Sequence, residues 1–308
     1  MHRPTVFVIG GGGMVGATVA QALAIREVVH EIVLIDVAED LARGQAMDIN
    51  HATAFTAGVQ VRIGTYEEIR EDDIVVITCG AAQKPGQTRL ELLDINAKII
   101  KDVVQKVMAQ GRPVYLLMVT NPVDVLTYIA LKTSGLPKER VFGTGTCLDT
   151  ARLRVALAQH LGVSQQVVEA YILGEHGDSS FAALSHASVG GVPLKDFPGY
   201  TQHMTADIEA SIRAAAYQII EAKKSTYYGI GYVVAKLVEA LVHDRSSIYP
   251  VCALVTGEYG LKDVVIGLPA LVGNRGVRIL DHYPLNDTER KKLQDSAAII
   301  QTALSNNR

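Results

Sequence analysis

A histidine between glycines is the residue of this sequence best suited to acid–base chemistry. His176 lies in the run Gly174-Glu-His-Gly-Asp, directly after an apolar stretch that predicts a strand. A histidine in such a loop can be reached by a small molecule, and its pKa suits proton transfer near neutral pH. The run therefore offers a proton donor for a carbonyl oxygen during hydride transfer to a ketone.

A second cluster, Asp149 and Arg152, contains the other residue types that such a reaction needs. Their i, i+3 spacing places both on one face of the first turn of a helix. A carboxylate beside His176 would fix its tautomer and favour the imidazolium, and a guanidinium would hold a substrate carboxylate by two hydrogen bonds. A helix-surface ion pair remains the alternative, because the spacing does not show that Asp149 and His176 meet.

A glycine-rich turn near the N-terminus predicts a dinucleotide site. The first predicted strand runs into Gly11-Gly-Gly-Met-Val-Gly16, and the second ends at Asp36, twenty residues after Gly16. Gly11 permits the tight turn, Gly13 a close approach to a pyrophosphate, and Gly16 close packing of helix on strand, while the helix N-terminus offers free N–H groups. Asp36 would accept hydrogen bonds from the ribose hydroxyls and repel a 2′-phosphate, which predicts NAD rather than NADP. A glycine-rich turn without a ligand is the alternative.

Apolar runs and helical patterns alternate through the first half of the chain, which predicts an α/β fold with a doubly wound parallel sheet of the Rossmann type. The predicted strands, rich in Val, Ile and Leu, are Thr5–Ile9, Glu31–Ile35, Gln60–Ile63, Ile74–Thr78, Val114–Val119 and Val141–Phe142. The predicted helices are Met14–Ile25, Ala38–Ile49, Leu90–Ala109 and Val123–Lys132.

The second half mixes short strands with long helices, which predicts an α+β catalytic domain. Its predicted strands are Val167–Leu173, Ala182–Val189, Val192–Leu194, Ser247–Thr256 and Val264–Val272. Its predicted helices are Thr150–His160, Met204–Leu241 with a break near Tyr228–Gly231, and Asp287–Leu304. We expect a dinucleotide-binding domain over residues 1–145 and a substrate domain over residues 146–308.

The composition argues against several classes of protein. Hydrophobic residues make up 48% of the chain and the net charge is −3, which indicates a folded core and no electrostatic attraction to nucleic acids or membrane surfaces. The N-terminus does not have the pattern of a secretory signal, and no apolar run approaches the roughly 20 residues of a membrane helix. The three cysteines have no metal-site or disulfide spacing. We therefore expect a cytoplasmic protein with no metal, nucleic-acid or membrane partner.

A series of motifs resembles the lactate/malate dehydrogenase family. In family order they are the glycine run at 10–16, Gln83-Lys-Pro-Gly-Gln-Thr-Arg89, Asn121-Pro-Val-Asp, Leu148-Asp-Thr-Ala-Arg-Leu-Arg and Gly174-Glu-His-Gly-Asp. The last two together are highly specific, and the likeness spans nearly the whole chain. Ala216-Tyr-Gln-Ile-Ile-Glu and Thr226-Tyr-Tyr-Gly-Ile-Gly resemble the lactate branch. The resemblance implies reversible hydride transfer between NADH and pyruvate, giving L-lactate and NAD in glycolysis and lactate fermentation.

The resemblance also implies a role for each matching residue. His176 would donate and accept the proton, Asp149 would orient it, and Arg152 would bind the substrate carboxylate. Arg89 would polarise the carbonyl from a mobile loop, Gly80–Leu90, whose closure would exclude water. The positions that match cofactor contacts in the family are Gly11, Gly13, Val15, Gly16, Asp36, Tyr66, Gly80, Ala81, Asn121 and Thr144.

Gln83 occupies the position that distinguishes substrates within the family, where similar malate dehydrogenases have Arg. Oxaloacetate would bury a second carboxylate with no cation to pair it, so the resemblance favours pyruvate. Thr226 would line the same pocket, and Asn121 would contact the substrate and the nicotinamide. Malate dehydrogenase activity remains the alternative if Lys84 turns inward, and Gln83 could also be a solvated loop residue.

For regulation and assembly, the resemblance offers only the residues that stand at matching positions. Arg154 matches an arginine of the fructose 1,6-bisphosphate site of many bacterial members, but Glu169 stands where the family has histidine. A carboxylate would repel the bisphosphate, so we expect weak or no activation and a structural ion pair for Arg154. Bacterial members imply a homotetramer, with a dimer as the alternative. A catalytically inert dinucleotide-binding regulator on the same fold is the competing class, and the complete catalytic set argues against it.

Overall fold

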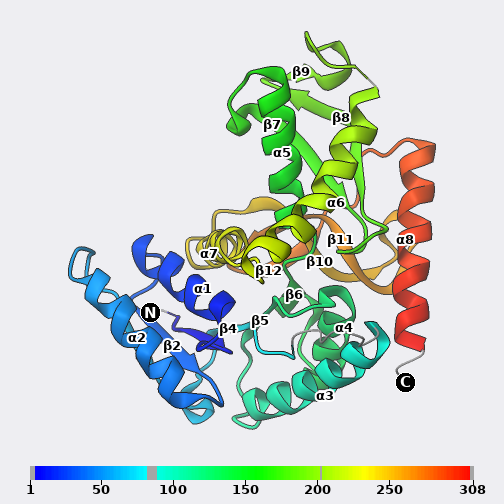
Figure 1. The fold of residues 1–308 in the computed structure, drawn as a ribbon. Coiled ribbons are helices and arrows are strands. Elements are labelled where there is room, and N and C mark those ends of the chain that lie inside the picture. Colours follow the sequence, from blue (N-terminus) through cyan, green and yellow to red (C-terminus); the bar gives the residue numbers. More distant parts are fainter. Residues whose placement is uncertain (1–3, 82–88, 202, 306–308) are drawn as a thin grey trace.

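The first half of the chain forms a parallel sheet covered on both faces by helices. The structure is a computed structural model that describes residues 4–81, 89–201 and 203–305 (Figure 1). Its first strands are β1 (Val6–Ile9), β2 (Glu31–Ile35), β3 (Gln60–Ile63), β4 (Ile74–Ile77), β5 (Tyr115–Met118) and β6 (Val141–Gly143). The helices between them are α1 (Met14–Ile25), α2 (Glu39–Thr53), α3 (Arg89–Met108) and α4 (Val123–Ser134).

The strand order is β3-β2-β1-β4-β5-β6, and every neighbouring pair is parallel. β1 and β4 are apolar and buried along their whole length, as strands covered on both faces must be. The order reverses between β1 and β4, where the chain crosses from one face of the sheet to the other. A ligand crevice is expected outside the carboxyl ends of the strands at such a point. The predicted doubly wound sheet is confirmed.

Three strands from the second half extend this sheet. The sequence predicted two of them as strands, but it did not predict that they join the parallel sheet. β10 (Ser247–Thr256), β11 (Lys262–Gly273) and β12 (Gly276–Ile279) form an antiparallel ribbon. β10 also pairs antiparallel with β6 through Cys252 and Gly143, so the described residues form one sheet of nine strands. β12 was missed because it is short and follows β11 after a two-residue turn. Hydrophobic pattern alone does not reveal which sheet a strand joins.

A smaller sheet completes the second half. β7 (Val168–Leu173), β8 (Phe181–Val189) and β9 (Val192–Pro193) pair antiparallel, and α5 (Cys147–Leu161) and α6 (His203–Lys223) pack on them. This unit has its own apolar core, and it lies at the top of Figure 1, away from α2 and α3. The closing helix α8 (Asp287–Ser305) packs on β8, β11 and α4, so it joins the two sheets.

The predicted long helix breaks earlier than expected. α6 ends at Lys223 and α7 (Tyr228–Val242) begins after four intervening residues, whereas the break was predicted near Tyr228–Gly231. Gly231 lies inside α7 because α1 packs closely there: a Cβ on Gly231 would lie 2.6 Å from the Thr18 side chain. The glycines suggested a helix end, but here a glycine serves helix–helix packing.

Candidate active site

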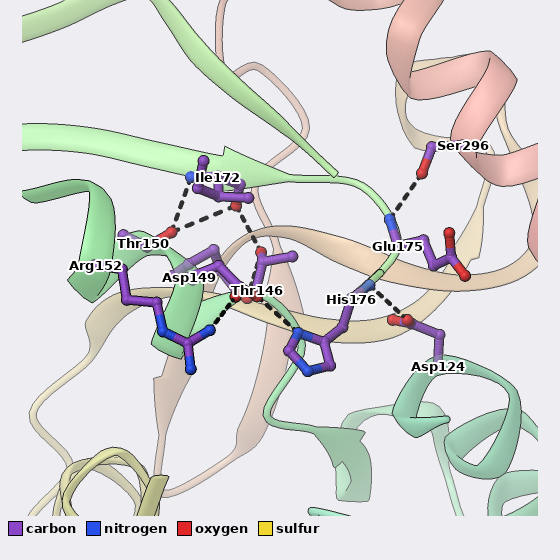
Figure 2. Close-up of polar contacts among 10 residues, drawn as sticks. Asp124, Thr146, Asp149, Thr150, Arg152, Ile172, Glu175, His176 and Ser296 are labelled. Atoms are coloured by element: carbon purple, nitrogen blue, oxygen red, sulfur yellow. Dashed lines mark hydrogen bonds and ion pairs between the residues drawn. The ribbon is translucent and has the colours of Figure 1, made fainter. Parts of the chain in front are cut away.

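The two clusters that the sequence singled out meet in space. His176 follows β7 in a short loop, and its Nδ1 lies 2.6 Å from Oδ2 of Asp149 in the first turn of α5 (Figure 2). The other carboxylate oxygen, Oδ1, accepts a hydrogen bond from the Arg152 guanidinium at 2.9 Å. The Asp149 side chain is 11% exposed and that of His176 is 26% exposed. Asp149 therefore does not form an ordinary surface ion pair, because it bridges an arginine and an accessible histidine.

Two threonines fix α5 against β7. The Thr146 hydroxyl donates to the Ile172 carbonyl at 2.6 Å, and the Ile172 N–H donates to the Thr150 hydroxyl at 2.9 Å. Both threonines are buried, and both lie within one helical turn of Asp149. These bonds set the distance between the helix that carries the carboxylate and the strand that leads to His176. α5 begins at Cys147, three residues before its predicted start, so Asp149 lies inside the helix.

The electrostatics of the cluster favour the ion pair. Burial raises the pKa of the Asp149 carboxyl, but the charges and hydrogen bonds of His176 and Arg152 outweigh it and hold the pKa below its usual value. Burial lowers the pKa of His176, but the charge and hydrogen bond of Asp149 outweigh it and raise the pKa above that of a free histidine. The imidazolium is therefore stabilised near neutral pH.

The backbone of the histidine loop is held by two residues that the sequence analysis missed. The His176 N–H donates to Oδ2 of Asp124 in α4 at 2.8 Å, and the Glu175 N–H donates to the Ser296 hydroxyl in α8 at 2.8 Å (Figure 2). The Gly174 end of the loop pairs with Gly267 of β11. Ser296 is fully buried between the apolar residues Leu293 and Ile300 of α8, and a polar residue at such a position is the signal that could have revealed it.

The glycine turn forms a cradle at the reversal point of the large sheet. α1 starts at Met14, and its N-cap residue Gly13 provides no side-chain cap, so the first N–H groups of the helix are available to an anion. A Cβ on Gly16 would collide with the Gly10 carbonyl oxygen, and Gly10 itself has a φ of +88°. Asp36 accepts from the Gly12 N–H at 2.9 Å, which ties the end of β2 to the turn. The cradle fits a dinucleotide pyrophosphate, with Asp36 close enough to serve an adjoining ribose.

The other predicted cofactor positions lie at the same edge of the sheet. Gly80 and Ala81 follow β4, Asn121 follows β5 and Thr144 follows β6, so all stand at carboxyl ends of neighbouring parallel strands. Val15, in the first turn of α1, is partly buried against the core. The structure thus gathers these residues along one edge of the sheet.

Tyr66 follows β3 at the same edge of the sheet, in a short helix, Tyr66–Glu68. Burial, with smaller effects of Cys79 and Asp36, raises the pKa of Tyr66 to about 12. The phenol of Tyr66 therefore stays neutral, and it lies near Asp36, the residue that follows β2.

An asparagine that the sequence analysis missed joins two of these loops. Asn96, buried in α3, accepts from the Ala81 N–H at 2.7 Å and donates to the Asn121 carbonyl oxygen at 3.0 Å. It stands on the apolar face of its helix, between Leu93 and Ile100. Asn96 therefore sets the spacing between the loops after β4 and β5.

Some predicted residues cannot be placed. Gln83, Lys84 and most of the predicted loop Gly80–Leu90 lie outside the described residues. Arg89 is the first residue of α3, and its side chain is also outside the described part. Thr226 lies partly buried between α6 and α7, three residues before Gly229, where a Cβ would lie 2.9 Å from Leu148. That junction is therefore beside the first turn of α5.

Arg154 forms a structural ion pair, as the sequence analysis expected, and has two further contacts that it did not predict. Its guanidinium donates to Glu169 at 3.4 Å and to the Ala170 carbonyl at 3.1 Å, and it lies over the Tyr171 ring. These contacts confirm an ion pair between Arg154 and Glu169.

Two further features concern residues 4–81, 89–201 and 203–305 only. No group of three or more His, Cys, Asp or Glu side chains there could hold a metal ion. No helix in this part of the chain is long and apolar enough to cross a membrane.

Comparison with known proteins gives the family. The model of the lactate/malate dehydrogenase NAD binding domain matches residues 5–143, and that of the lactate/malate dehydrogenase alpha/beta C-terminal domain matches residues 146–307. The chain belongs to the lactate/malate dehydrogenase family. Its first half is thus an NAD-binding domain, and the strand reversal at the carboxyl edge is the place where doubly wound sheets generally bind a dinucleotide.

Members of the lactate/malate dehydrogenase family resemble this chain over its whole length. The L-lactate dehydrogenase of Pediococcus pentosaceus is 44% identical over 307 residues, which cover 99% of this chain and 95% of that protein. The L-lactate dehydrogenase of Thermus aquaticus is 45% identical, covering 96% and 97%. The crystal structure of a lactate dehydrogenase enzyme from a Medee basin deep-sea metagenome library has a TM-score of 0.96 at 40% identity, covering 100% and 99%.

Proposed function

We propose that this protein is an NAD-dependent L-lactate dehydrogenase that interconverts pyruvate with NADH and L-lactate with NAD. The observation that carries the proposal is the bridge from Arg152 through Asp149 to His176, at the carboxyl-terminal edge of an NAD-binding sheet. A dinucleotide-binding regulator would have no need of a histidine whose pKa is raised beside an arginine. The full-length relatives named above are L-lactate dehydrogenases.

His176 is proposed as the acid in pyruvate reduction. Its Nδ1 is committed to Asp149, so Nε2 is the nitrogen that can face a carbonyl oxygen. NADH held at the glycine cradle beside Asp36 would supply the hydride to the carbonyl carbon, and His176 would give its proton to the oxygen. Asp149 keeps the ring oriented and stabilises the imidazolium before transfer. In lactate oxidation the neutral imidazole takes the hydroxyl proton.

Arg152 is proposed to bind the substrate carboxylate. Its hydrogen bond to Asp149 leaves further N–H donors of the guanidinium available for a planar carboxylate. We extend the proposal to Arg89 as the residue that polarises the carbonyl, and to Asn121 and Thr226 as substrate contacts. Asn121 follows β5 at the carboxyl edge of the sheet, and Thr226 follows α6 in the junction beside the first turn of α5.

Gln83 is proposed to decide between pyruvate and oxaloacetate. In a closed site, a neutral amide leaves the second carboxylate of oxaloacetate unpaired, which costs several kcal/mol. We predict that Gln83→Arg raises kcat/KM for oxaloacetate at least about tenfold and lowers it for pyruvate, with Gln83→Asn as the uncharged control. If Gln83→Arg gains no oxaloacetate activity, another residue, such as Lys84, sets the preference.

The wider setting is also a proposal. We infer a homotetramer in the cytoplasm that serves glycolysis by reducing pyruvate to lactate, and a division into domains 1–145 and 146–308. The pairing of Arg154 with Glu169 supports weak or absent activation by fructose 1,6-bisphosphate. Sedimentation of the purified protein tests the tetramer.

The deciding experiment is a comparison of kcat/KM for pyruvate and oxaloacetate with saturating NADH, with and without fructose 1,6-bisphosphate. A preference for pyruvate supports the proposal. A preference for oxaloacetate would overturn the substrate and leave the chemistry of His176 in place, while no NADH oxidation with either acid would overturn the function.

A further inference from the structure

The Asn121-Pro-Val-Asp motif ends in a carboxylate that the proposed reaction does not use. Asp124 is the second residue of α4, in the helix turn that follows β5, and it is 2% exposed. Its Oδ2 accepts the backbone N–H of His176 at 2.8 Å. Its Oδ1 is buried and has no hydrogen-bond partner within the described residues. A buried carboxylate with one unsatisfied oxygen costs stability, so its retention needs a reason.

The charge balance of the site supplies that reason. Asp149 is shared between two cations, because one oxygen serves His176 and the other serves Arg152. The positive charge of Arg152 itself lowers the pKa of His176. Asp124 approaches the histidine on the side away from Asp149 (Figure 2), whereas Arg152 forms its ion pair with Asp149. Two carboxylates therefore balance two cations when the imidazole is protonated.

We propose that Asp124 is a positioning residue for His176, whose buried carboxylate both holds the loop backbone and supplies a second negative charge that stabilises the imidazolium. This inference rests on the proposed function. The first turn of α4 helps to keep the carboxylate charged, because a helix N-terminus favours negative charge. The Asp124 side chain provides both the hydrogen bond to the His176 backbone and the negative charge near the His176 ring. A displacement of the loop would therefore change both effects together.

The groups around Asp124 come from several elements. His176 and Glu175 face it from the loop after β7, and the Cys252 thiol faces it from β10. Burial raises the pKa of Asp124 to about 6, against the lowering effects of the His176 N–H and charge, while Glu175 raises it further. Asp124 is therefore mostly ionised at neutral pH, where its negative charge can stabilise the His176 imidazolium.

Asp124→Asn separates charge from position, because the amide oxygen can still accept the His176 N–H. The matched control is Ser296→Ala, which removes the uncharged anchor of the adjacent Glu175 peptide. The measurement is kcat and KM for pyruvate across pH at saturating NADH. For Asp124→Asn we expect the pH above which kcat/KM falls to move down by about one unit, with about a tenfold loss at alkaline pH that appears in KM. For Ser296→Ala we expect activity to drop without movement of the midpoint.

The outcomes separate this proposal from the function on which it rests. If the unaltered protein does not reduce pyruvate, the function fails. If the unaltered protein does reduce pyruvate, two results refute the role of Asp124. One is a pH profile of kcat/KM whose midpoint is the same in Asp124→Asn as in the unaltered protein, and the other is an equal movement of the midpoint in Ser296→Ala. Should Asp124→Asn not fold, the histidine resonances of the unaltered NADH complex decide. His176 should then show a second, smaller titration step near the Asp124 pKa of about 6, and a single step would refute the proposal.

Discussion

Replacing Asp149 by Asn tests the electrostatic origin of the active histidine. The amide oxygen can still accept the Nδ1–H of His176, so geometry is retained and the charge is lost. Two unit charges about 4 Å apart interact by about 4 kcal/mol at an effective dielectric constant of about 20. That energy corresponds to about three pH units in the titration of the imidazole.

Two features of the structure change this figure, and they act in opposite directions. The His176 side chain is 26% exposed, so water screens part of the interaction. Arg152 also loses its carboxylate partner, and a freed guanidinium repels the imidazolium, which acts in the opposite direction and keeps the effect substantial. We therefore expect the titration of His176 to move down by about two pH units in Asp149→Asn.

The sign follows from the raised pKa of His176. Pyruvate reduction needs the imidazolium, so kcat/KM is full below the histidine pKa and falls as pH rises through it. In Asp149→Asn the fall begins at lower pH, so kcat/KM is about 100-fold below that of the unaltered protein at alkaline pH. The difference in kcat/KM between the two proteins becomes smaller as pH decreases towards the lower midpoint of Asp149→Asn.

The assay is the initial rate of NADH oxidation with pyruvate varied at each pH. Asp196→Asn is the control, because Asp196 is an exposed carboxylate at the end of a short helix outside the site. Its profile should match that of the unaltered protein. A profile for Asp149→Asn that is lower at every pH but keeps its midpoint would refute the charge argument and leave Asp149 as an orienting group alone.

Two other perturbations follow from the structure. Asp36→Ala should raise the KM for NADH roughly 10- to 100-fold and relax discrimination against NADPH, because charge-assisted hydrogen bonds to the ribose and the tie to Gly12 are lost, and comparison of the two cofactors checks this. Glu239→Gln should lower the melting temperature by about 2–6 °C at neutral pH, because Glu239 of α7 pairs with Arg26 next to α1 at 2.6 Å. Burial raises the pKa of Glu239, but Lys236 and Arg26 outweigh it and lower the pKa to about 2, so this stability is present above the pKa of a free glutamate and lost as pH falls towards 2. Melting curves of both proteins should therefore converge in acid, and a constant difference would contradict the linkage.

The sequence predicted the elements of the parallel half well because their signals are local. Strands buried on both faces read as continuous apolar runs, and Glu31–Ile35, Gln60–Ile63 and Met14–Ile25 begin and end as predicted. The pairing of β10 with β6 was not predictable in this way. It depends on tertiary contact between residues far apart in the chain, and neither strand carries a mark of its partner.

The site shows the same division. Residue types and family motifs indicated His176, Asp149 and Arg152, and the structure supplied their contacts. Asp124, Asn96 and Ser296 were missed because the role of a polar residue in a helix depends on the loop to which it is hydrogen-bonded. The sequence does not show which loop that is. Asp124 lies within the Asn121-Pro-Val-Asp motif, but the backbone N–H from which it accepts a hydrogen bond belongs to His176, in another segment of the chain.

The junction of β6 and β10 has a consequence for how the protein is made. On the ribosome, β1 to β6 and their helices emerge first and can fold, because their contacts lie within the first half of the chain. The outer edge of β6 then remains unpaired until about 110 further residues have been synthesised and β10 arrives. During that interval an apolar strand edge is open to pairing with a neighbouring nascent chain. The late arrival of β10 therefore both completes the sheet and ends the period in which the growing chain is most exposed to aggregation.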